Sequence, residues 1–191
     1  MRVIAGTLRG KVLSTIRGNA VRPTSDKIRG AIFSALSSRL GSFDGCRILD
    51  MFAGSGALSI EALSRGAEFS VLFDTSDESL ELVRKNLKAC GLAQHSRVVR
   101  GNAIIHLDRA LAEGPYDVVF VDPPYGKNMA QQALETVATQ GMLKDGAWVI
   151  AETGRNETLP ETIGNLELSH KKDYGSTSIH YYNLDLVEEG P

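Results

Sequence analysis

The chain has few of the features that mark a membrane, secreted or metal-binding protein. It has two cysteines, four histidines and six prolines in 191 residues. Cys46 and Cys90 do not form a metal or redox spacing, nor do the histidines, so we expect no metal site and two buried, reduced thiols. No apolar run approaches the roughly 18 residues of a membrane-spanning helix. The first residues lack the apolar stretch of a signal peptide, so we expect a cytoplasmic protein without a membrane partner.

Charge is unevenly distributed, although the net charge is only −2. Residues 1–29 hold seven basic side chains and one acid, whereas the other 162 residues hold fourteen basic and twenty-two acidic side chains. Residues 1–29 therefore carry a net charge of +6, and residues 30–191 carry −8. Such asymmetry suggests that the amino-terminal residues contact a polyanion. An ordinary solvated basic arm is the alternative that charge alone leaves open.

Hydrophobic patterning predicts one domain in which strands and helices alternate. Residues 1–22 are expected to form an extended hairpin, followed by a helix over 25–40. Strands are expected at 47–50, 69–73, 96–100, 116–121 and 147–152, helices at 58–64, 76–89, 103–112 and 130–140, and an antiparallel strand pair at 166–172 and 177–186. Because continuous apolar strands alternate with helices, we expect an α/β fold. Its sheet is doubly wound and mostly parallel, with seven strands, an antiparallel carboxyl-terminal pair and an amino-terminal β-hairpin extension.

The most informative stretch is Asp122-Pro123-Pro124-Tyr125, which directly follows the apolar residues 116–121. It is expected to be the end of a buried parallel strand that breaks into a rigid turn, because two prolines remove two backbone donors and fix φ. We call residues 122–125 the spur. It offers an acidic oxygen, backbone carbonyls and an aromatic ring. These groups suit chemistry on the exocyclic amine of a nucleobase.

A glycine-rich turn, Asp50-Met51-Phe52-Ala53-Gly54-Ser55-Gly56, ends the first expected strand. Glycines allow a close approach to a ligand, and the following helix offers free N–H groups. Only two of the three glycines of a dinucleotide fingerprint are present, because Ser59 stands at the third position. A loop that merely packs closely is the alternative. Asp50 would repel a pyrophosphate and better fits a cationic ligand, such as the amino acid portion of S-adenosylmethionine.

Three further strand ends carry polar residues. Asp74 follows the second strand, where an acid commonly accepts hydrogen bonds from ribose hydroxyls. Asn102 follows the third strand and can donate and accept, which suits an adenine edge. A turn residue and a helix cap are the respective alternatives. Glu152, at the end of the fifth strand, lies either near the ligand pocket that these strand ends would form or in solvent as an ordinary strand-end acid.

Two motifs together resemble a known class of enzyme. The turn from Asp50 to Gly56 is similar to the first cofactor motif of Rossmann-like S-adenosylmethionine-dependent methyltransferases. The spur resembles the signature of those that methylate exocyclic amines of nucleobases. The resemblance extends over almost the whole chain to the bacterial family of 16S rRNA (guanine(966)-N(2))-methyltransferases. It is carried by Ala5-Gly6-Thr7-Leu8-Arg9-Gly10, by Arg22-Pro23-Thr24-Ser25-Asp26-Lys27-Ile28-Arg29, and by Phe52 to Leu58 running into Glu61 to Gly66.

This resemblance implies a hairpin extension over 1–22 that contacts RNA and a methyltransferase domain over 23–191. It implies S-adenosylmethionine as cofactor and 16S rRNA or a small-subunit ribonucleoprotein as partner. A monomer is taken as the default. The implied cofactor contacts are Thr24, Asp50, Phe52, Ala53, Gly54, Ser55, Gly56, Asp74, Asn102 and Ala103. The implied catalytic residues are Asp122, Pro123, Pro124 and Tyr125, which bind the target amine and stack on the flipped base. The resemblance places Arg22 near RNA phosphates, and the basic charge of residues 1–29 adds Arg9, Lys11, Arg17 and Arg29 as expected RNA contacts. Asn102 departs from the family pattern, in which acids are frequent.

Three other functions fit parts of the sequence less well. A DNA adenine-N6 methyltransferase would need a target-recognition domain, and 191 residues leave no room for a large one. A non-catalytic RNA-binding module would not need the intact spur and glycine turn. A dinucleotide oxidoreductase is disfavoured by Ser59 and Asp50.

Overall fold

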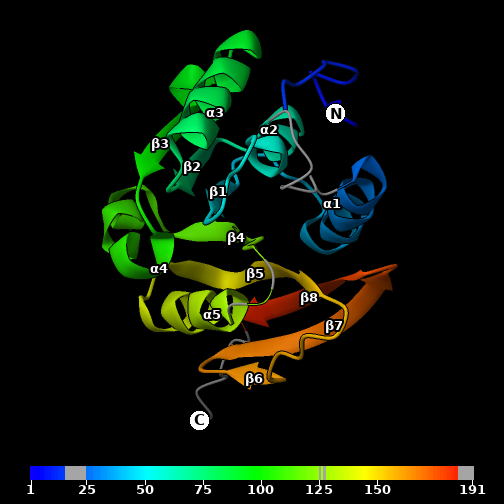
Figure 1. Ribbon diagram of the computed structural model, residues 1–191, viewed down its shortest axis with the longest axis vertical. Helices are drawn as coiled ribbons and strands as arrows, with labels where there is room; N and C mark the ends of the chain where they lie inside the picture. Colours follow the sequence, from blue (N-terminus) through cyan, green and yellow to red (C-terminus); the bar gives the residue numbers. More distant parts are fainter. Residues whose placement is uncertain (16–24, 125, 127, 185–191) are drawn as a thin grey trace.

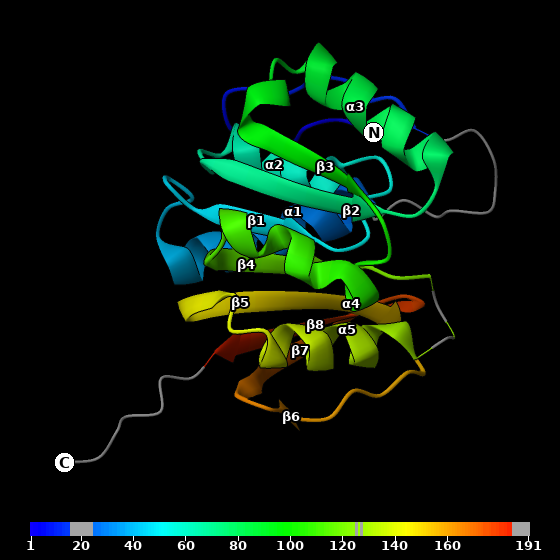
Figure 2. The same cartoon turned by 90° about the vertical axis from the view of Figure 1, so that its left-hand side faces the viewer.

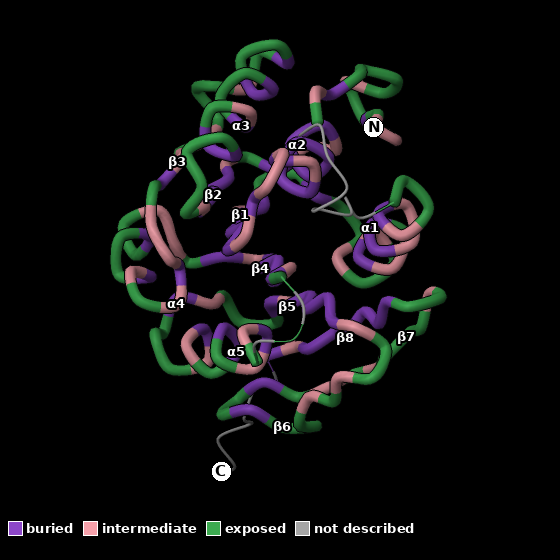
Figure 3. Tube along the Cα trace, in the orientation of Figure 1, coloured by how far each residue is buried: buried purple, intermediate pink, exposed green. Residues whose placement is uncertain are grey.

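Helices cover both faces of one central sheet in the computed structural model (Figures 1 and 2), which describes residues 1–15, 25–124, 126 and 128–184. The sheet has eight strands in the order β3-β2-β1-β4-β5-β8-β7-β6. The most deeply buried residues follow the central strands (Figure 3). The prediction of a mostly parallel α/β sheet with an antiparallel carboxyl-terminal part is therefore confirmed.

Five strands form the parallel part of the sheet, and they pair side by side in the order β3-β2-β1-β4-β5. The interiors of β1, β2 and β4 and the second half of β5 are almost fully buried, which is why they appear as continuous apolar runs, whereas the edge strand β3 is largely exposed. β1, β3 and β4 have the expected bounds. The five strands are β1 (Arg47–Asp50), β2 (Phe69–Asp74), β3 (Ser96–Arg100), β4 (Tyr116–Val121) and β5 (Leu143–Gly154).

The helices divide between the two faces of the sheet. One face is covered by α1 (Asp26–Leu40), α2 (Ala57–Ser64) and α3 (Asp77–Ala89), and the other by α4 (Ala103–His106) and α5 (Met129–Thr139). A short 3-10 turn, η1 (Ala93–His95), precedes β3. The helix expected over 103–112 is a single α-turn followed by the 3-10 helix η2 (Leu107–Glu113). The buried positions three and four residues apart fit both helix types, so periodicity does not distinguish them.

The antiparallel part contains one strand more than expected. β8 (Thr177–Leu184) pairs with β5 on one side and with β7 (Leu166–Tyr174) on the other. The additional strand is β6 (Thr162–Ile163), which pairs with the start of β7. Two residues are too few to produce an alternating pattern, so sequence reasoning missed it.

Residues 1–15, which we call the arm, fold back on themselves and pack on the sheet domain. The Val3 N–H donates to the Lys11 carbonyl at 3.0 Å, and the Leu13 N–H donates to the Met1 carbonyl at 3.1 Å. Val3 and Leu13 are buried in the same core cluster as the residues of α1 and α2. The boundary expected at residue 22 lies outside the described residues.

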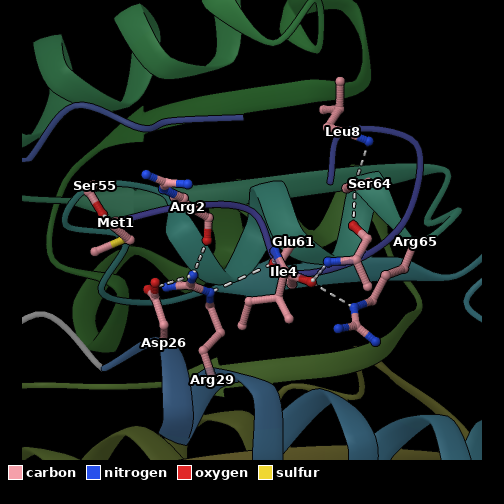
Figure 4. Close-up of polar contacts among 11 residues, drawn as sticks. Met1, Arg2, Ile4, Leu8, Asp26, Arg29, Ser55, Glu61, Ser64 and Arg65 are labelled. Atoms are coloured by element: carbon pink, nitrogen blue, oxygen red, sulfur yellow. Dashed lines mark hydrogen bonds and ion pairs between the residues drawn. The ribbon is translucent and has the colours of Figure 1, made fainter. Parts of the chain in front are cut away.

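Buried polar groups of α2 hold the arm in place (Figure 4). Glu61 is fully buried, and its two carboxylate oxygens accept from the Ile4 N–H at 2.7 Å and the Ala5 N–H at 3.0 Å. Arg65 donates to the same carboxylate at 2.8 Å. Ser64 adds an Oγ that accepts from the Leu8 N–H at 3.0 Å. These bonds hold residues 4–8 of the arm against α2, while Arg9 and Lys11 remain exposed.

Gly6 lies where the arm approaches α2 most closely, and its replacement makes a sharp test of the docking. A Cβ on Gly6 would lie 1.7 Å from the Ser64 carbonyl oxygen, whereas a Cβ on Gly10 meets nothing within 4 Å. Both glycines have positive φ, +80° and +85°. Gly10→Ala should therefore lower the free energy of unfolding by about 1–2 kcal/mol, the cost of a left-handed backbone conformation at a residue with a side chain. Gly6→Ala should lower it by at least about 3 kcal/mol, because the arm must also move. Urea unfolding measures both, and equal losses would contradict this docking.

Candidate active site

The carboxyl ends of β1, β2, β4 and β5 lie along one edge of the sheet, where ligands bind in doubly wound folds. The register pairs Asp50 with Leu72 of β2 and with Phe120 of β4. From β1 the chain continues to β2 and β3 on one side of β1, and β4 and β5 lie on its other side. The point at which the strand order reverses therefore falls between β1 and β4. Asp50, Asp74 and the spur therefore come from neighbouring positions of one edge.

Residues 51–56, which we call the glycine loop, connect β1 to α2. Gly54 and Gly56 have positive φ, +54° and +77°. The Gly54 N–H donates to Oδ2 of Asp74 at 2.9 Å, and the Ala53 N–H donates to the Phe73 carbonyl at 2.8 Å. The loop is thus fixed against the end of β2, with the amino terminus of α2 behind it.

Asp50 is a buried acid with an unused oxygen. It is 1% exposed, and its Oδ2 accepts from the Ser59 hydroxyl at 3.0 Å. Its Oδ1 has no hydrogen-bond partner within the described residues. Burial raises the pKa of Asp50 to about 7, against the opposing hydrogen bond from Ser59. A buried acceptor without a partner fits an incoming cationic donor.

Asp74 shapes the glycine loop and retains capacity for a ligand. Its Oδ2 accepts from the Gly54 N–H, and its Oδ1 accepts from the Ser76 N–H at 2.9 Å. Each carboxylate oxygen can accept more than one hydrogen bond. The carboxylate can therefore hold the loop and still accept a bond from a hydroxyl.

Asn102 acts as a helix cap in this structure. Its Oδ1 accepts from the Ile104 N–H at 3.0 Å at the start of α4. The next residue, Ala103, is 1% exposed and packs in the core cluster on the α5 side. The helix-cap alternative is thus observed for Asn102, and a role beside an adenine ring stays a prediction for both residues.

The spur begins directly after β4, as expected. Asp122 is partly buried, Pro123 is buried and Pro124 is exposed, whereas Tyr125 lies outside the described residues. The Gly126 N–H, just after the spur, and the Gly154 N–H at the end of β5 both donate to Glu157, at 3.4 and 3.1 Å. An open pocket of about 310 Å³ lies here, between residues 157–159 and the start of α5.

Glu152 is buried beside Asp122 and is not a solvated strand-end acid. It is 8% exposed. The register pairs Val121 of β4 with Ala151 of β5, so Asp122 and Glu152 follow at equivalent positions. Sequence reasoning left both readings of Glu152 open, because exposure at a strand end depends on what packs above it.

The predicted RNA contacts separate into three groups. Arg9 and Lys11 are exposed on the arm. Arg29 is fully buried and pairs with Asp26, with the Arg2 carbonyl and, at 3.7 Å, with Glu61. We therefore correct the prediction for Arg29, because a guanidinium enclosed by these partners does not present its charge to a nucleic acid. The remaining predicted residues, Arg17 and Arg22, lie outside the described residues, as does the predicted cofactor contact Thr24.

Asn86 of α3 is a functional candidate that sequence reasoning missed. It is 2% exposed and hydrogen-bonded to Ser14 of the arm and to Ser55 of the glycine loop. The signal was present in the sequence, because a polar residue stands in the buried stripe formed by Leu80, Val83 and Leu87.

None of the helices among the described residues is both long and apolar enough to cross a membrane. Over the same residues, no group of three or more acidic, histidine or cysteine side chains is arranged to hold a metal ion.

Comparison with known proteins places the chain in a family. The family model described as Conserved hypothetical protein 95 matches residues 1–183. The chain belongs to this family. The match to Conserved hypothetical protein 95 begins at residue 1, so the arm is part of what the family shares, and the resemblance inferred from the motifs is confirmed.

Individual relatives match over nearly the full length. Ribosomal RNA small subunit methyltransferase D of Escherichia coli (strain K12) is 33% identical over 189 residues, which are 99% of this chain and 92% of that protein. YlbH of Bacillus subtilis (strain 168) is 38% identical over 183 residues, 95% of this chain and 98% of that protein. The solved structure of yhhF from Escherichia coli is 33% identical with a TM-score of 0.82, and the match covers 97% of this chain and 98% of that one.

Proposed function

We propose that this protein transfers a methyl group from S-adenosylmethionine to the exocyclic N2 amine of a guanine in 16S ribosomal RNA. The observation that carries the proposal is the alignment of Asp50, Asp74 and Asp122 along one edge of the sheet. The ribosomal RNA class is supported by the name of the relative from Escherichia coli, Ribosomal RNA small subunit methyltransferase D.

The residues at the glycine loop fit S-adenosylmethionine. The buried Oδ1 of Asp50 would accept from the ammonium of the methionine portion, which supplies the donor that this oxygen lacks within the described residues. Asp74 would accept from the ribose hydroxyls, and Asn102 with Ala103 would flank the adenine. When bound, the cofactor supplies an electrophilic methyl group on a sulfonium.

The spur would position the target amine. The amine of guanine is a poor nucleophile, because its lone pair is delocalised into the ring. Asp122 and the Pro123 carbonyl would accept from its N–H groups, so that the nitrogen pyramidalises and directs its lone pair toward the methyl group. This is catalysis by positioning and electrostatics, without a covalent enzyme intermediate. Tyr125 would stack on the flipped base, an interaction worth about 1–3 kcal/mol.

Glu152 favours guanine over adenine as the target. Next to its N2 amine, guanine carries an N1–H donor, whereas the N1 of adenine is an acceptor. A carboxylate can only accept. A buried carboxylate beside Asp122 would therefore bind the guanine edge and repel that of adenine.

The reaction is tested with small ribosomal subunits from a bacterial strain that lacks its own enzyme of this kind. After incubation with methyl-tritiated S-adenosylmethionine, we expect label in 16S rRNA that digests to N2-methylguanosine. Label in DNA, or in N6-methyladenosine, would contradict the proposal and support an adenine methyltransferase.

The arm should supply electrostatic affinity for RNA. Replacing Arg9 and Lys11 by alanine should weaken RNA binding and lower the slope of log K against log salt by about 2, because each phosphate contact contributes close to 1. Filter binding between 50 and 200 mM salt, as used for such slopes, measures the change. The matched control replaces Arg97 and Lys144, two basic residues at the opposite edge of the sheet. If both double variants change the slope equally, the arm has no special role.

A further inference from the structure

One side chain, Asn86, contacts both the arm and the glycine loop. Its amide nitrogen donates to the Ser14 carbonyl at 3.0 Å and to the Ser55 carbonyl at 2.9 Å. Its Oδ1 accepts from the Ser14 N–H at 2.9 Å. Both donors of the amide are used, so its orientation is set by the two segments together.

The arm also touches the glycine loop directly. The Ser55 hydroxyl donates to the sulfur of Met1 at 3.8 Å (Figure 4). Ser55 stands between Gly54 and Gly56, both of which have positive φ. The arm therefore meets the loop at Ser55, next to the Gly54 N–H that donates to Asp74.

A second set of contacts fixes the arm without involving the loop. Ser64 of α2 is 1% exposed; its hydroxyl accepts from the Leu8 N–H at 3.0 Å and donates to the Ala5 carbonyl at 2.7 Å. Ser64 and Asn86 are thus two buried polar residues that each hold the arm by more than one hydrogen bond. Of the two, Asn86 has the bond to the glycine loop.

We propose that Asn86 is a positioning residue that couples RNA binding on the arm to cofactor binding in the glycine loop, an inference that rests on the proposed function. Arg9 and Lys11 are exposed on the arm, and phosphate contacts there would stabilise its docked position. This stabilisation would extend through Ser14 to the amide of Asn86 and on to Ser55. A loop that is already ordered loses less conformational entropy when the cofactor binds. By linkage, the cofactor strengthens RNA binding by the same factor.

The experiment measures the affinity of radiolabelled S-adenosylhomocysteine, the demethylated product, by equilibrium dialysis. It is run with and without small ribosomal subunits from a strain that lacks this methyltransferase. For the wild type we expect the subunits to tighten binding at least about fivefold, a typical coupling. In Asn86→Ala the factor should fall below about twofold. Ser64→Ala, the matched control, should keep the wild-type factor even where it weakens subunit binding.

A second variant guards against a folding defect. Asn86→Ser is uncharged and shorter, so it removes the bond to the Ser55 carbonyl without burying a carboxylate against two carbonyl oxygens, and it should lose the coupling as well. With both substrates saturating, kcat of the folded variants should stay within about threefold of wild type, because Asn86 does not touch the reacting atoms.

Three results would overturn the coupling: no tightening in the wild type, full tightening in the Asn86 variants, or equal loss in Ser64→Ala. Failure of the proposed function looks different. In that case the wild type transfers no methyl group to small-subunit RNA, whatever the dialysis shows.

Discussion

Asp122→Ala should lower the rate of methyl transfer by about 10²–10³-fold, the usual cost of removing one group that stabilises a transition state. Asp122 follows β4 at the active edge and is partly buried, whereas the glycine loop that would hold the cofactor follows β1. Its loss should therefore leave the affinity for S-adenosylmethionine within about twofold. Single-turnover rates and calorimetry measure the two quantities separately.

Asp122→Asn decides whether the side chain takes a proton or orients the amine. An amide oxygen still accepts a hydrogen bond but is a far weaker base. If Asp122 only orients the amine, Asp122→Asn should retain at least about a tenth of the wild-type rate. A loss as large as that of Asp122→Ala would show that the carboxylate is needed as a base. Near-wild-type turnover in Asp122→Ala would refute the role of the spur.

Asp50→Asn should have the largest effect on cofactor affinity. Removing one partner of a buried charge pair costs about 2–5 kcal/mol, which is at least about 30-fold in the dissociation constant. Ser59→Ala is the matched control, because it removes the hydrogen bond to Asp50 but keeps the carboxylate. Ser59→Ala should weaken the free energy of cofactor binding by about 1 kcal/mol. Calorimetry with S-adenosylmethionine would contradict the ammonium role if the two variants weakened binding equally.

The same replacement should stabilise the protein without cofactor. The pKa of Asp50 is about 7 in the folded chain, against 3.8 as the ordinary value. The folded state then holds a proton that the unfolded state has lost, so the stability falls as pH rises from 3.8 to 7, by on the order of 4 kcal/mol. Asp50→Asn should lack this fall and be the more stable protein at pH 8. Urea unfolding across this pH range tests the sign.

Cofactor affinity should show the matching pH dependence. Below pH 7 the carboxyl of Asp50 must lose its proton before it can pair with the ammonium. Affinity should therefore rise about tenfold per pH unit up to about 7 and then level. In Asp50→Asn this rise should be absent, and a rise of equal size would assign it to another group.

Much of the fold could be predicted because its strands are buried on both faces. A short apolar run between two helices, such as 116–121, predicts a buried parallel strand. The site residues follow directly after such runs. β6 was missed because it has two residues. The 3-10 character of η2 was missed because burial every three or four residues fits both helix types.

The site was predictable at strand ends but not across distant segments. Asp50 and Asp74 follow from their positions in the strand pattern. Arg29 does not, because its burial depends on Glu61 and on the Arg2 carbonyl, which meet it only through tertiary packing. Charge alone does not show whether an arginine faces solvent. Asn86 likewise becomes meaningful only when Ser14 and Ser55, 41 residues apart in sequence, meet at its amide.

The central claim is that this chain makes N2-methylguanosine in 16S rRNA. Mass spectrometry of 16S rRNA from a strain in which the gene is deleted tests it most directly. We predict that one N2-methylguanosine is lost, that the wild-type gene restores it, and that the gene carrying Asp122→Ala does not. An unchanged content of N2-methylguanosine in the deletion strain would contradict the account.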